Sequence, residues 1–206
     1  PGTRCAVSTP SGPGGRRARR TDQPEDIRRY QTVFADSERV GAVAAPTAGF
    51  HFTRRLLDRL DEKGVSRIEL TLHVGPGTFK PVTADRIEEH RVDAEFAELS
   101  QEAADAINSV RAAGGKLFAV GTTSVRTLES ARLVDGKVQP LAGMVDLYIR
   151  PGHRFQLVDH MITNFHLPKS SLLILVSAFA GRERMLAAYR QAIEARLRFY
   201  SYGDAM

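Results

Sequence analysis

Residues 116–130 read KLFAVGTTSVRTLES, and this stretch determines the class of fold that the chain is expected to adopt. Its opening KLFAV is typical of a short apolar strand that is buried in the protein. A glycine, three hydroxyl residues and a helical pattern follow at once, and another helical pattern, 101–115, precedes the strand. This helix–strand–helix order predicts an α/β protein with parallel strands and crossover helices.

The segments on either side continue the alternation of helices and strands. Thr53 and Ser100 are expected to cap helices, as is one of the serines at 170–171. Residues 67–74 alternate apolar and polar side chains, as a strand does. The other predicted elements are a short helix at 83–90, strands at 145–149 and 157–167, and helices at 171–180 and 182–199.

The net charge of +5 is concentrated in the first twenty residues. Residues 1–20 contain five of the 29 basic residues and no acidic residue, so residues 21–206 carry 24 basic and 24 acidic side chains. Net charge therefore gives no indication of a basic surface on the body of the protein. The Gly-, Pro-, Ser- and Arg-rich stretch 1–20 is predicted to be disordered, and its GRRARR (15–20) either contacts phosphate or is a solvated tail.

Several classes of protein are disfavoured by what the chain lacks. The longest apolar run, 172–180, is far shorter than the roughly 18 residues of a membrane span. A single cysteine, Cys5, excludes an internal disulfide and a cysteine-based metal cluster, which fits a reducing cytoplasm. The histidines do not have the H-x-x-x-H or H-E-x-x-H spacing of zinc ligands, and a G-x-S-x-G hydrolase motif is missing.

Polar residues gather where predicted strands end, which is where α/β proteins place ligands. His51 follows a tight, small-residue turn, and His73 precedes a glycine-rich loop. Thr122, Thr123 and Ser124 stand at a helix start, where free backbone N–H groups suit a carboxylate or another anion. A lone structural histidine and ordinary helix capping are the alternative explanations.

A further cluster lies in ITNFHLPKS (162–170). Asn164 and His166 share one side of the expected strand, and Lys169 follows them. Strand termination and capping explain the proline and the serines of this stretch, but they explain the two adjacent polar side chains poorly. In the preceding helix, Arg126 and Glu129 are three residues apart and share a face.

Eight stretches together resemble one known family. They are YQTVFA (30–35), AAPTAGFHFT (44–53), LTLHVGPGTFKPV (70–82), IEEH (87–90), AVGTTSVRTLES (119–130), ITNFHLPKS (162–170), LVSAFAGRE (175–183) and RFYSYGDAM (198–206). In order and approximate spacing they are similar to the successive motifs of the S-adenosylmethionine:tRNA ribosyltransferase-isomerases of queuosine biosynthesis. The resemblance extends from about Tyr30 to Met206.

The resemblance implies a cytoplasmic, monomeric tRNA-modifying transferase. Such enzymes move the ribosyl moiety of S-adenosylmethionine onto 7-aminomethyl-7-deazaguanine in tRNA and isomerise it, which gives epoxyqueuosine and releases adenine and methionine. S-adenosylmethionine is then a consumed substrate, and neither a cofactor nor a metal is expected. The partners implied are S-adenosylmethionine and the precursor-containing tRNA, without a membrane.

This chemistry assigns hypothetical roles to the polar clusters. A base must remove a proton beside the sulfonium, and histidine suits proton transfer near neutral pH. His51, His73 and His166 are therefore the catalytic candidates. The candidates for binding a carboxylate or the ribose hydroxyls are Thr122, Thr123 and Ser124. The candidates for orienting the substrate are Arg126, Asn164 and Lys169.

The resemblance also implies a domain organisation. The family's main domain is a barrel-like α/β domain, and we expect residues 30–206 to be its C-terminal portion, after an atypical or disordered tail at 1–29. The N-terminal strands and an inserted small β-barrel domain are expected to be absent. Two alternatives to an active enzyme of this family remain. One is a truncated, non-catalytic remnant that binds tRNA or S-adenosylmethionine, and the other is an unrelated α/β transferase.

Overall fold

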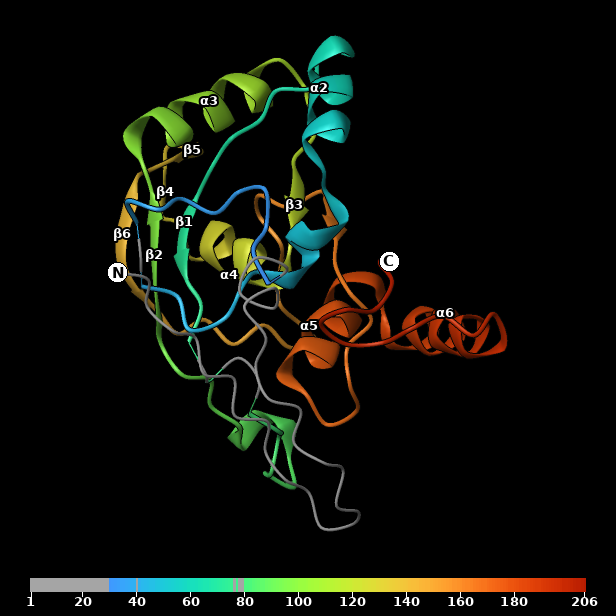
Figure 1. Ribbon diagram of the computed structural model, residues 1–206. Helices are drawn as coiled ribbons and strands as arrows, with labels where there is room; N and C mark the ends of the chain where they lie inside the picture. Colours follow the sequence, from blue (N-terminus) through green and yellow to red (C-terminus); the bar gives the residue numbers. More distant parts are fainter. Residues whose placement is uncertain (1–29, 40, 76, 78–79) are drawn as a thin grey trace.

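The protein is described by a computed structural model, which covers residues 30–39, 41–75, 77 and 80–206 (Figure 1). The tail predicted at 1–29 lies outside these residues. The helices are η1 (Thr47–His51), α2 (Arg54–Glu62), η3 (Ile87–Glu89), α3 (Gln101–Ala112), α4 (Thr122–Ser130), α5 (Ser171–Ala180) and α6 (Arg182–Glu194). The strands are β1 (Thr71–His73), β2 (Glu95–Leu99), β3 (Phe118–Val120), β4 (Leu133–Val134), β5 (Lys137–Val138), β6 (Leu141–Val145) and β7 (His160–Ile162).

The strands form three small sheets. β1, β2 and β6 make an antiparallel sheet in the order β1-β2-β6, and β4 and β5 make a hairpin. β3 and β7 are parallel, with Val120 opposite Ile162. The mixed α/β fold that the sequence predicts is confirmed. The expected parallel pairing holds for β3 and β7 only, among the strands that the structure describes, because β1 joins β2 through an irregular segment and not through a crossover helix.

The hydrophobic core surrounds α4. This helix packs against β2 and β6 on one side and against β3 and α5 on others, and Figure 1 shows it near the centre of the molecule. Six of its nine residues are buried. The largest fully buried side chains of the core are Val74, Leu99, Ile107, Val125, Val138 and Ile149. α6 extends away from this core and packs on α5.

The helix starts follow the predicted capping residues. The Thr53 hydroxyl accepts the Leu56 N–H at 3.2 Å, and the Ser100 hydroxyl accepts the Ala103 N–H at 3.1 Å. Ser170, and not its neighbour, caps α5. α4 starts differently, because Gly121 precedes it with a φ of 93° and without a side-chain cap. A residue with a Cβ atom would be strained in that conformation.

Several predicted elements are shorter than expected or shifted. The helix predicted at 83–90 is only the 3₁₀ turn η3, and the strand predicted at 67–74 is confined to β1. The strand predicted at 145–149 lies earlier, as β6, where it pairs with β2. The helix predicted at 182–199 ends at Glu194, because Arg196 takes a left-handed conformation with a φ of 55°.

The strand predicted at 157–167 is also shorter, because its second half has a different partner. Only residues 160–162, as β7, pair with β3, and Thr163 exchanges two backbone hydrogen bonds with Met206, at 3.0 and 2.7 Å.

In the parts of the chain that the structure covers, none of the helices has the length and apolar character that crossing a membrane requires.

Candidate functional site

The parallel strands β3 and β7 bring two of the polar clusters to one edge. The carboxyl ends of parallel strands lie at the same edge of a sheet, and the Gly121 N–H donates to the Ile162 carbonyl across it at 2.8 Å. Thr122 follows β3 at this edge, and Asn164 follows β7. A third segment, η1, reaches the same place, since a Cβ atom at Gly121 would lie 3.7 Å from that of Ala48. We call this place the β3–β7 edge.

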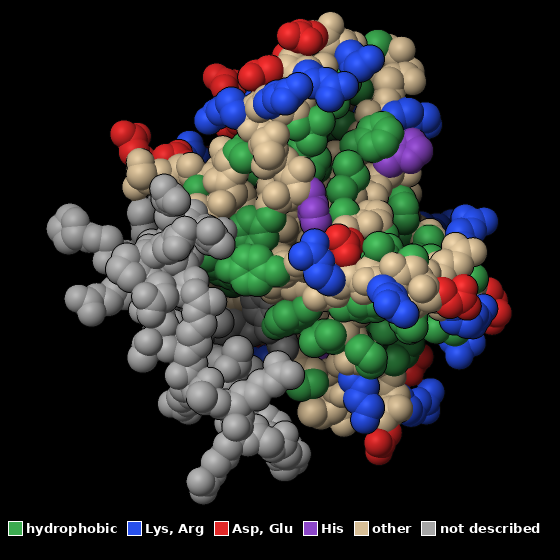
Figure 2. Space-filling model, turned by 45° about the vertical axis from the view of Figure 1, so that its right-hand side comes forward, with side chains coloured by type: hydrophobic (Ala, Val, Ile, Leu, Met, Phe, Trp, Pro, Cys, Tyr) green, Lys and Arg blue, Asp and Glu red, His purple; other side chains and the backbone are tan. Residues whose placement is uncertain are grey.

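A turn near the end of the sequence closes the β3–β7 edge. The Phe165 N–H donates to the Asp204 carbonyl at 3.3 Å, and the Tyr200 N–H donates to the Phe165 carbonyl at 2.8 Å. With the Thr163–Met206 pair, these bonds lay residues 198–206 alongside the segment that follows β7. The sequence motif RFYSYGDAM contributed to the family resemblance, but none of its residues was predicted to lie at a site. Figure 2 shows the face that is obtained by turning the right-hand side of Figure 1 forward, with apolar, basic, acidic and histidine side chains mixed over it.

Asn164 is held in this edge with half of its amide group unused. The residue is 2% exposed, and its Nδ2 donates to the Tyr200 carbonyl at 3.0 Å and to the Ser201 carbonyl at 3.4 Å. Its Oδ1 is buried and has no hydrogen-bond partner among the described residues. A buried acceptor without a partner costs about 1–3 kcal/mol, so this oxygen is suited to an N–H or O–H group of a ligand.

His51 ends η1 and shares this property. Its Nε2 is buried and lacks a hydrogen-bond partner in the described part of the chain. The pKa of Asp204 lies below its ordinary value, mainly because the Arg198 backbone N–H bonds its carboxylate at 2.7 Å and the Arg198 guanidinium at 3.3 Å. The ring of Phe50, the residue before His51, stacks on Tyr202 with centroids 5.7 Å apart. The end of η1 therefore lies against the turn that contains Asp204.

His166 is buried in the same region, but it is already paired. Its ring Nε2 lies 3.1 Å from the Thr163 hydroxyl, and its backbone N–H donates to the Tyr189 hydroxyl at 2.7 Å. Burial lowers the pKa of His166 to about 4. The ring is therefore neutral at pH 7 and a weak base, which suits a hydrogen-bonding role better than proton abstraction.

The low pKa of His166 predicts an acid-sensitive fold. Below pH 6.5 the unfolded chain binds a proton at this histidine, whereas the folded chain does not until about pH 4. The free energy of unfolding should therefore fall by about 3 kcal/mol as the pH decreases through this window. Urea unfolding of the parent chain and of His166→Gln across these pH values measures the effect, and the variant should lose that part of the pH dependence.

The exposed His160 offers a matched control for the pH experiment. His160→Gln should keep the acid-dependent fall of the parent chain. The interpretation is wrong if His166→Gln and the parent chain lose the same free energy of unfolding between the two pH values.

The hydroxyl cluster at the start of α4 is partly used inside the protein. The Ser124 hydroxyl donates to the Val120 carbonyl at 2.8 Å, and Thr122 is buried. Thr123 is half-buried, and its carbonyl accepts the Thr127 hydroxyl at 3.1 Å. Because α4 starts without a side-chain cap, its first backbone N–H groups remain suited to an anion.

Arg126 points into the protein. It is 6% exposed, and its Nη1 donates to Glu95 Oε2 at 2.9 Å. Its other nitrogens donate, at 3.1 to 3.3 Å, to the carbonyls of Asp93, Val145 and Leu147. The second Glu95 oxygen accepts the Gly75 N–H at 2.8 Å. These contacts give Arg126 a structural role that joins α4 to β2, β6 and the loop after β1, and its predicted role toward a substrate stays a prediction.

Glu129 lies on the same helix face, and its carboxylate is buried as well. One oxygen accepts the N–H groups of Leu157 and Val158 at 3.0 Å each, and the other accepts the Gln156 N–H at 2.8 Å and lies 3.3 Å from His153 Nε2. The face that Arg126 and Glu129 share therefore carries two buried charges that fasten loops to α4.

The last two predicted site residues lie elsewhere. His73 is on β1, where its ring packs edge-to-face on Phe96 with centroids 5.3 Å apart. The Lys169 side chain is exposed, and its backbone, with a φ of 57°, accepts the Val82 N–H at 2.7 Å. None of the contacts described for these two residues reaches the β3–β7 edge.

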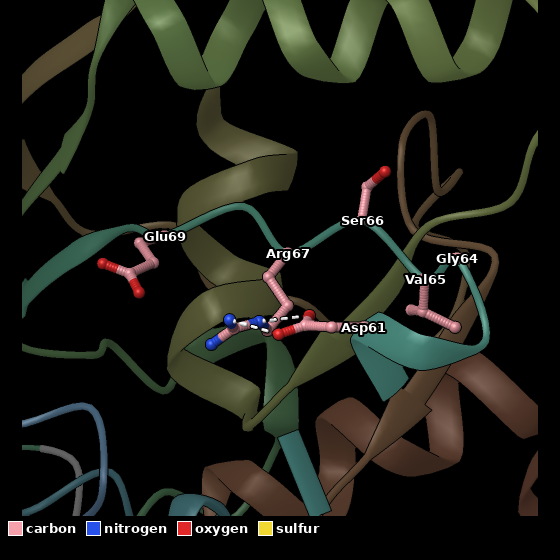
Figure 3. A pocket seen from close by; sticks show the side chains of 6 residues that line it. All are labelled: Asp61, Gly64, Val65, Ser66, Arg67 and Glu69. Carbon is pink, nitrogen blue, oxygen red and sulfur yellow. Dashed lines mark hydrogen bonds and ion pairs between the residues drawn. The ribbon is translucent and has the colours of Figure 1, made fainter. Parts of the chain in front are cut away.

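A hollow on the surface lies apart from this edge. Figure 3 shows that it is formed by the segment between Asp61 and Glu69, where the Arg67 guanidinium makes two hydrogen bonds to Asp61, at 2.9 and 2.7 Å. Its lining includes none of the predicted site residues.

Within the described ranges, no group of three histidine, cysteine, aspartate or glutamate side chains is arranged to bind a metal ion.

Comparison with known proteins identifies the fold and then the family. The crystal structure of an S-adenosylmethionine tRNA ribosyltransferase from Thermotoga maritima matches 77% of this chain and 50% of its own, with a TM-score of 0.64 and 43% sequence identity. The family model described as "Queuosine biosynthesis protein" matches residues 12–206. The chain belongs to this queuosine biosynthesis family.

Two curated relatives agree with this assignment. They are the S-adenosylmethionine:tRNA ribosyltransferase-isomerases of two strains of Caulobacter vibrioides, NA1000 / CB15N and ATCC 19089 / CIP 103742 / CB 15. Each is 56% identical to this chain over 188 residues, which is 91% of this chain and 51% of the relative. The chain therefore spans about half the length of the curated relatives that it matches.

Proposed function

We propose that this chain carries out, or contributes the described site to, the S-adenosylmethionine:tRNA ribosyltransferase-isomerase reaction. The ribosyl moiety of S-adenosylmethionine is moved onto 7-aminomethyl-7-deazaguanine in tRNA and isomerised, with release of adenine and methionine, to give epoxyqueuosine. The observation that supports this most is the presence of two unpaired, buried polar atoms, His51 Nε2 and Asn164 Oδ1, at one strand edge of a chain 56% identical to curated enzymes of this name.

The geometry ranks the candidate catalytic histidines. Removal of a proton beside the sulfonium needs a base with a free nitrogen, and His51 Nε2 has one. His166 is neutral, weakly basic and paired with Thr163, so we assign it to support of the site. His73 would contribute from the β1–β2–β6 sheet, beside the loop that Glu95 fastens at Gly75.

The remaining predicted residues are proposed to bind different parts of the substrates. Asn164 Oδ1 accepts a hydrogen from an amino group, either that of the adenine or that of the deazaguanine side chain. The N-terminus of α4, with Thr122, Thr123 and Ser124, holds the methionine carboxylate or ribose hydroxyls. Lys169, exposed at the turn before α5, is the cation proposed to orient the substrate directly. Arg126, whose guanidinium is engaged with Glu95 and three carbonyls, would act by holding α4 in position.

The wider proposal follows the family. S-adenosylmethionine is consumed as a substrate, and the reaction uses neither a further cofactor nor a metal. The protein works as a monomer in the cytoplasm on tRNA that carries the precursor base. Residues 30–206 are part of a catalytic α/β domain, and the described sheets belong to a barrel-like arrangement.

The test is an assay of adenine release. The chain is incubated with S-adenosylmethionine and with tRNA that carries 7-aminomethyl-7-deazaguanine, and free adenine is measured by chromatography. Adenine should accumulate only with the precursor tRNA, and not with the same tRNA carrying guanine at the wobble position. If adenine does not form while S-adenosylmethionine or tRNA still binds in calorimetry, the chain is the non-catalytic binding remnant and the enzymatic proposal is wrong.

A further inference from the structure

Three aromatic rings from distant parts of the chain meet beside the β3–β7 edge. The rings of Phe50 and Tyr202 are parallel, with an interplanar angle of 5° and centroids 5.7 Å apart. Tyr30 contacts both, at 5.5 Å from Phe50 and 5.9 Å from Tyr202. We call this group the aromatic platform. Its outermost ring, Tyr202, is 62% exposed, which is unusual for a large aromatic side chain held against two others.

Hydrogen bonds order the backbone around Tyr202, and the ring itself packs on Phe50 and Tyr30. The Gly203 N–H donates to the Tyr200 carbonyl at 3.0 Å, and the Asp204 N–H donates to the Arg198 carbonyl at 2.8 Å. Gly203 is tightly enclosed, because a Cβ atom there would come within 2.5 Å of the Arg198 carbonyl oxygen. An exposed ring that is already ordered loses little entropy when a flat ligand stacks on it.

The platform borders the proposed site on both sides. Phe50 directly precedes His51, and its ring stacks on Tyr202, which follows Ser201, a residue whose carbonyl accepts the Asn164 amide. A ligand stacked on Tyr202 would therefore lie next to the two unpaired polar atoms of the β3–β7 edge.

Cationic side chains flank the platform in sequence. Arg54 and Arg55 are exposed in the first turn of α2, which contains no acidic residue and starts shortly after Phe50. Arg196 and Arg198 are exposed in the turn that leads to Tyr202. Arg198 is paired with Asp204, and the other three guanidinium groups, close in sequence to the aromatic platform, suit a ligand that combines a planar base with phosphate charges.

We propose that the aromatic platform stacks an unpaired nucleobase of an RNA strand and holds that strand beside the β3–β7 edge. This inference rests on the proposed function for its choice of RNA. The open position of Tyr202 favours RNA over S-adenosylmethionine, because small-molecule sites enclose most of their ligand, whereas single-stranded bases stack on exposed aromatic faces.

The absence of tryptophan from the chain makes a direct test available. In Tyr202→Trp the new ring is the sole tryptophan of the chain, and its fluorescence can be excited selectively over that of the tyrosines. A short RNA hairpin with an unpaired, purine-rich loop should quench its fluorescence, and a blunt RNA duplex of the same length should not. By fluorescence anisotropy with a labelled hairpin, Tyr202→Ala should weaken binding about ten-fold or more, and Tyr202→Phe should bind like the parent chain.

Phe118 provides the matched control. It is also 62% exposed and also stacks on another ring, that of His160 at 4.3 Å, but it lies at the start of β3 and not at the β3–β7 edge. Phe118→Ala should leave hairpin affinity unchanged. Circular dichroism and thermal unfolding of each variant show whether it is folded, and Tyr202→Phe and Tyr202→Trp keep the test valid if Tyr202→Ala unfolds.

Two results would overturn the proposal. One is equal hairpin affinity for the parent chain and a folded Tyr202→Ala. The other is quenching of Tyr202→Trp by S-adenosylmethionine but not by the hairpin, which would assign the platform to the adenine of the small substrate. Because these readouts measure binding and not turnover, they are independent of the adenine-release assay: the platform can fail while the enzymatic function stands, and the reverse.

Discussion

Replacing Arg126 by methionine is expected to lower the free energy of unfolding by about 3–5 kcal/mol. The change leaves the Glu95 carboxylate, 5% exposed, without its ionic partner, and it removes the donors to three backbone carbonyls. A buried charge that loses its partner is among the most destabilising single changes. Chemical denaturation monitored by circular dichroism measures the loss.

The exposed Arg67–Asp61 pair is the control for this experiment. Arg67→Met also removes an arginine that makes two hydrogen bonds to a carboxylate, but both side chains are in water, so the loss should be much smaller. The double variant Arg126→Met/Glu95→Leu should recover part of the stability, because it removes the buried carboxylate that has lost its arginine. If Arg126→Met costs no more than Arg67→Met, the pair does not fasten α4 to the sheet.

Replacing His51 by alanine is expected to reduce adenine release by about 10²- to 10⁴-fold, the usual contribution of a positioned acid or base. His51 is the candidate with a buried ring nitrogen that has no partner in the described residues. The rate of adenine release at saturating S-adenosylmethionine and precursor tRNA measures the effect.

The exposed His160 again provides the comparison, since His160→Ala should release adenine at the parent rate. His73→Ala and His166→Ala complete the series, and we expect smaller reductions in the catalytic rate than for His51→Ala. Full activity in all three variants His51→Ala, His73→Ala and His166→Ala would sink the histidine assignment while leaving the family unchanged.

Local sequence patterns predicted the central part of the fold well. KLFAV and the glycine and hydroxyl residues after it predicted β3 and α4, and the capping serine and threonine residues predicted the starts of α2, α3 and α5. These features depend on neighbouring residues, so they can be inferred from a short window of sequence. The same helix–strand–helix order predicted that parallel strands occur, but it did not identify β7 as the partner of β3. The expected burial of β3 is wrong at Phe118, which is 62% exposed.

What the patterns missed depends on distant residues. The 3.6-residue period placed Arg126 and Glu129 on one face, but it did not show that this face is buried against Glu95 and the loop 156–158. The turn 198–206 has no regular period, so its position along the segment after β7 was not predicted. The strand at 157–167 was extended too far for the same reason, since Thr163 pairs with Met206.

The way in which the β3–β7 edge is assembled has a consequence for folding order. The Asn164 side chain bonds to a carbonyl 36 residues further along the chain, whereas α3, β3 and α4 are consecutive and pack together locally. Contacts that close long loops form later than local ones, because the loss of chain entropy comes before the gain from the contact. We therefore expect a newly synthesised chain to condense around α4 first and to complete the β3–β7 edge in a separate, later step.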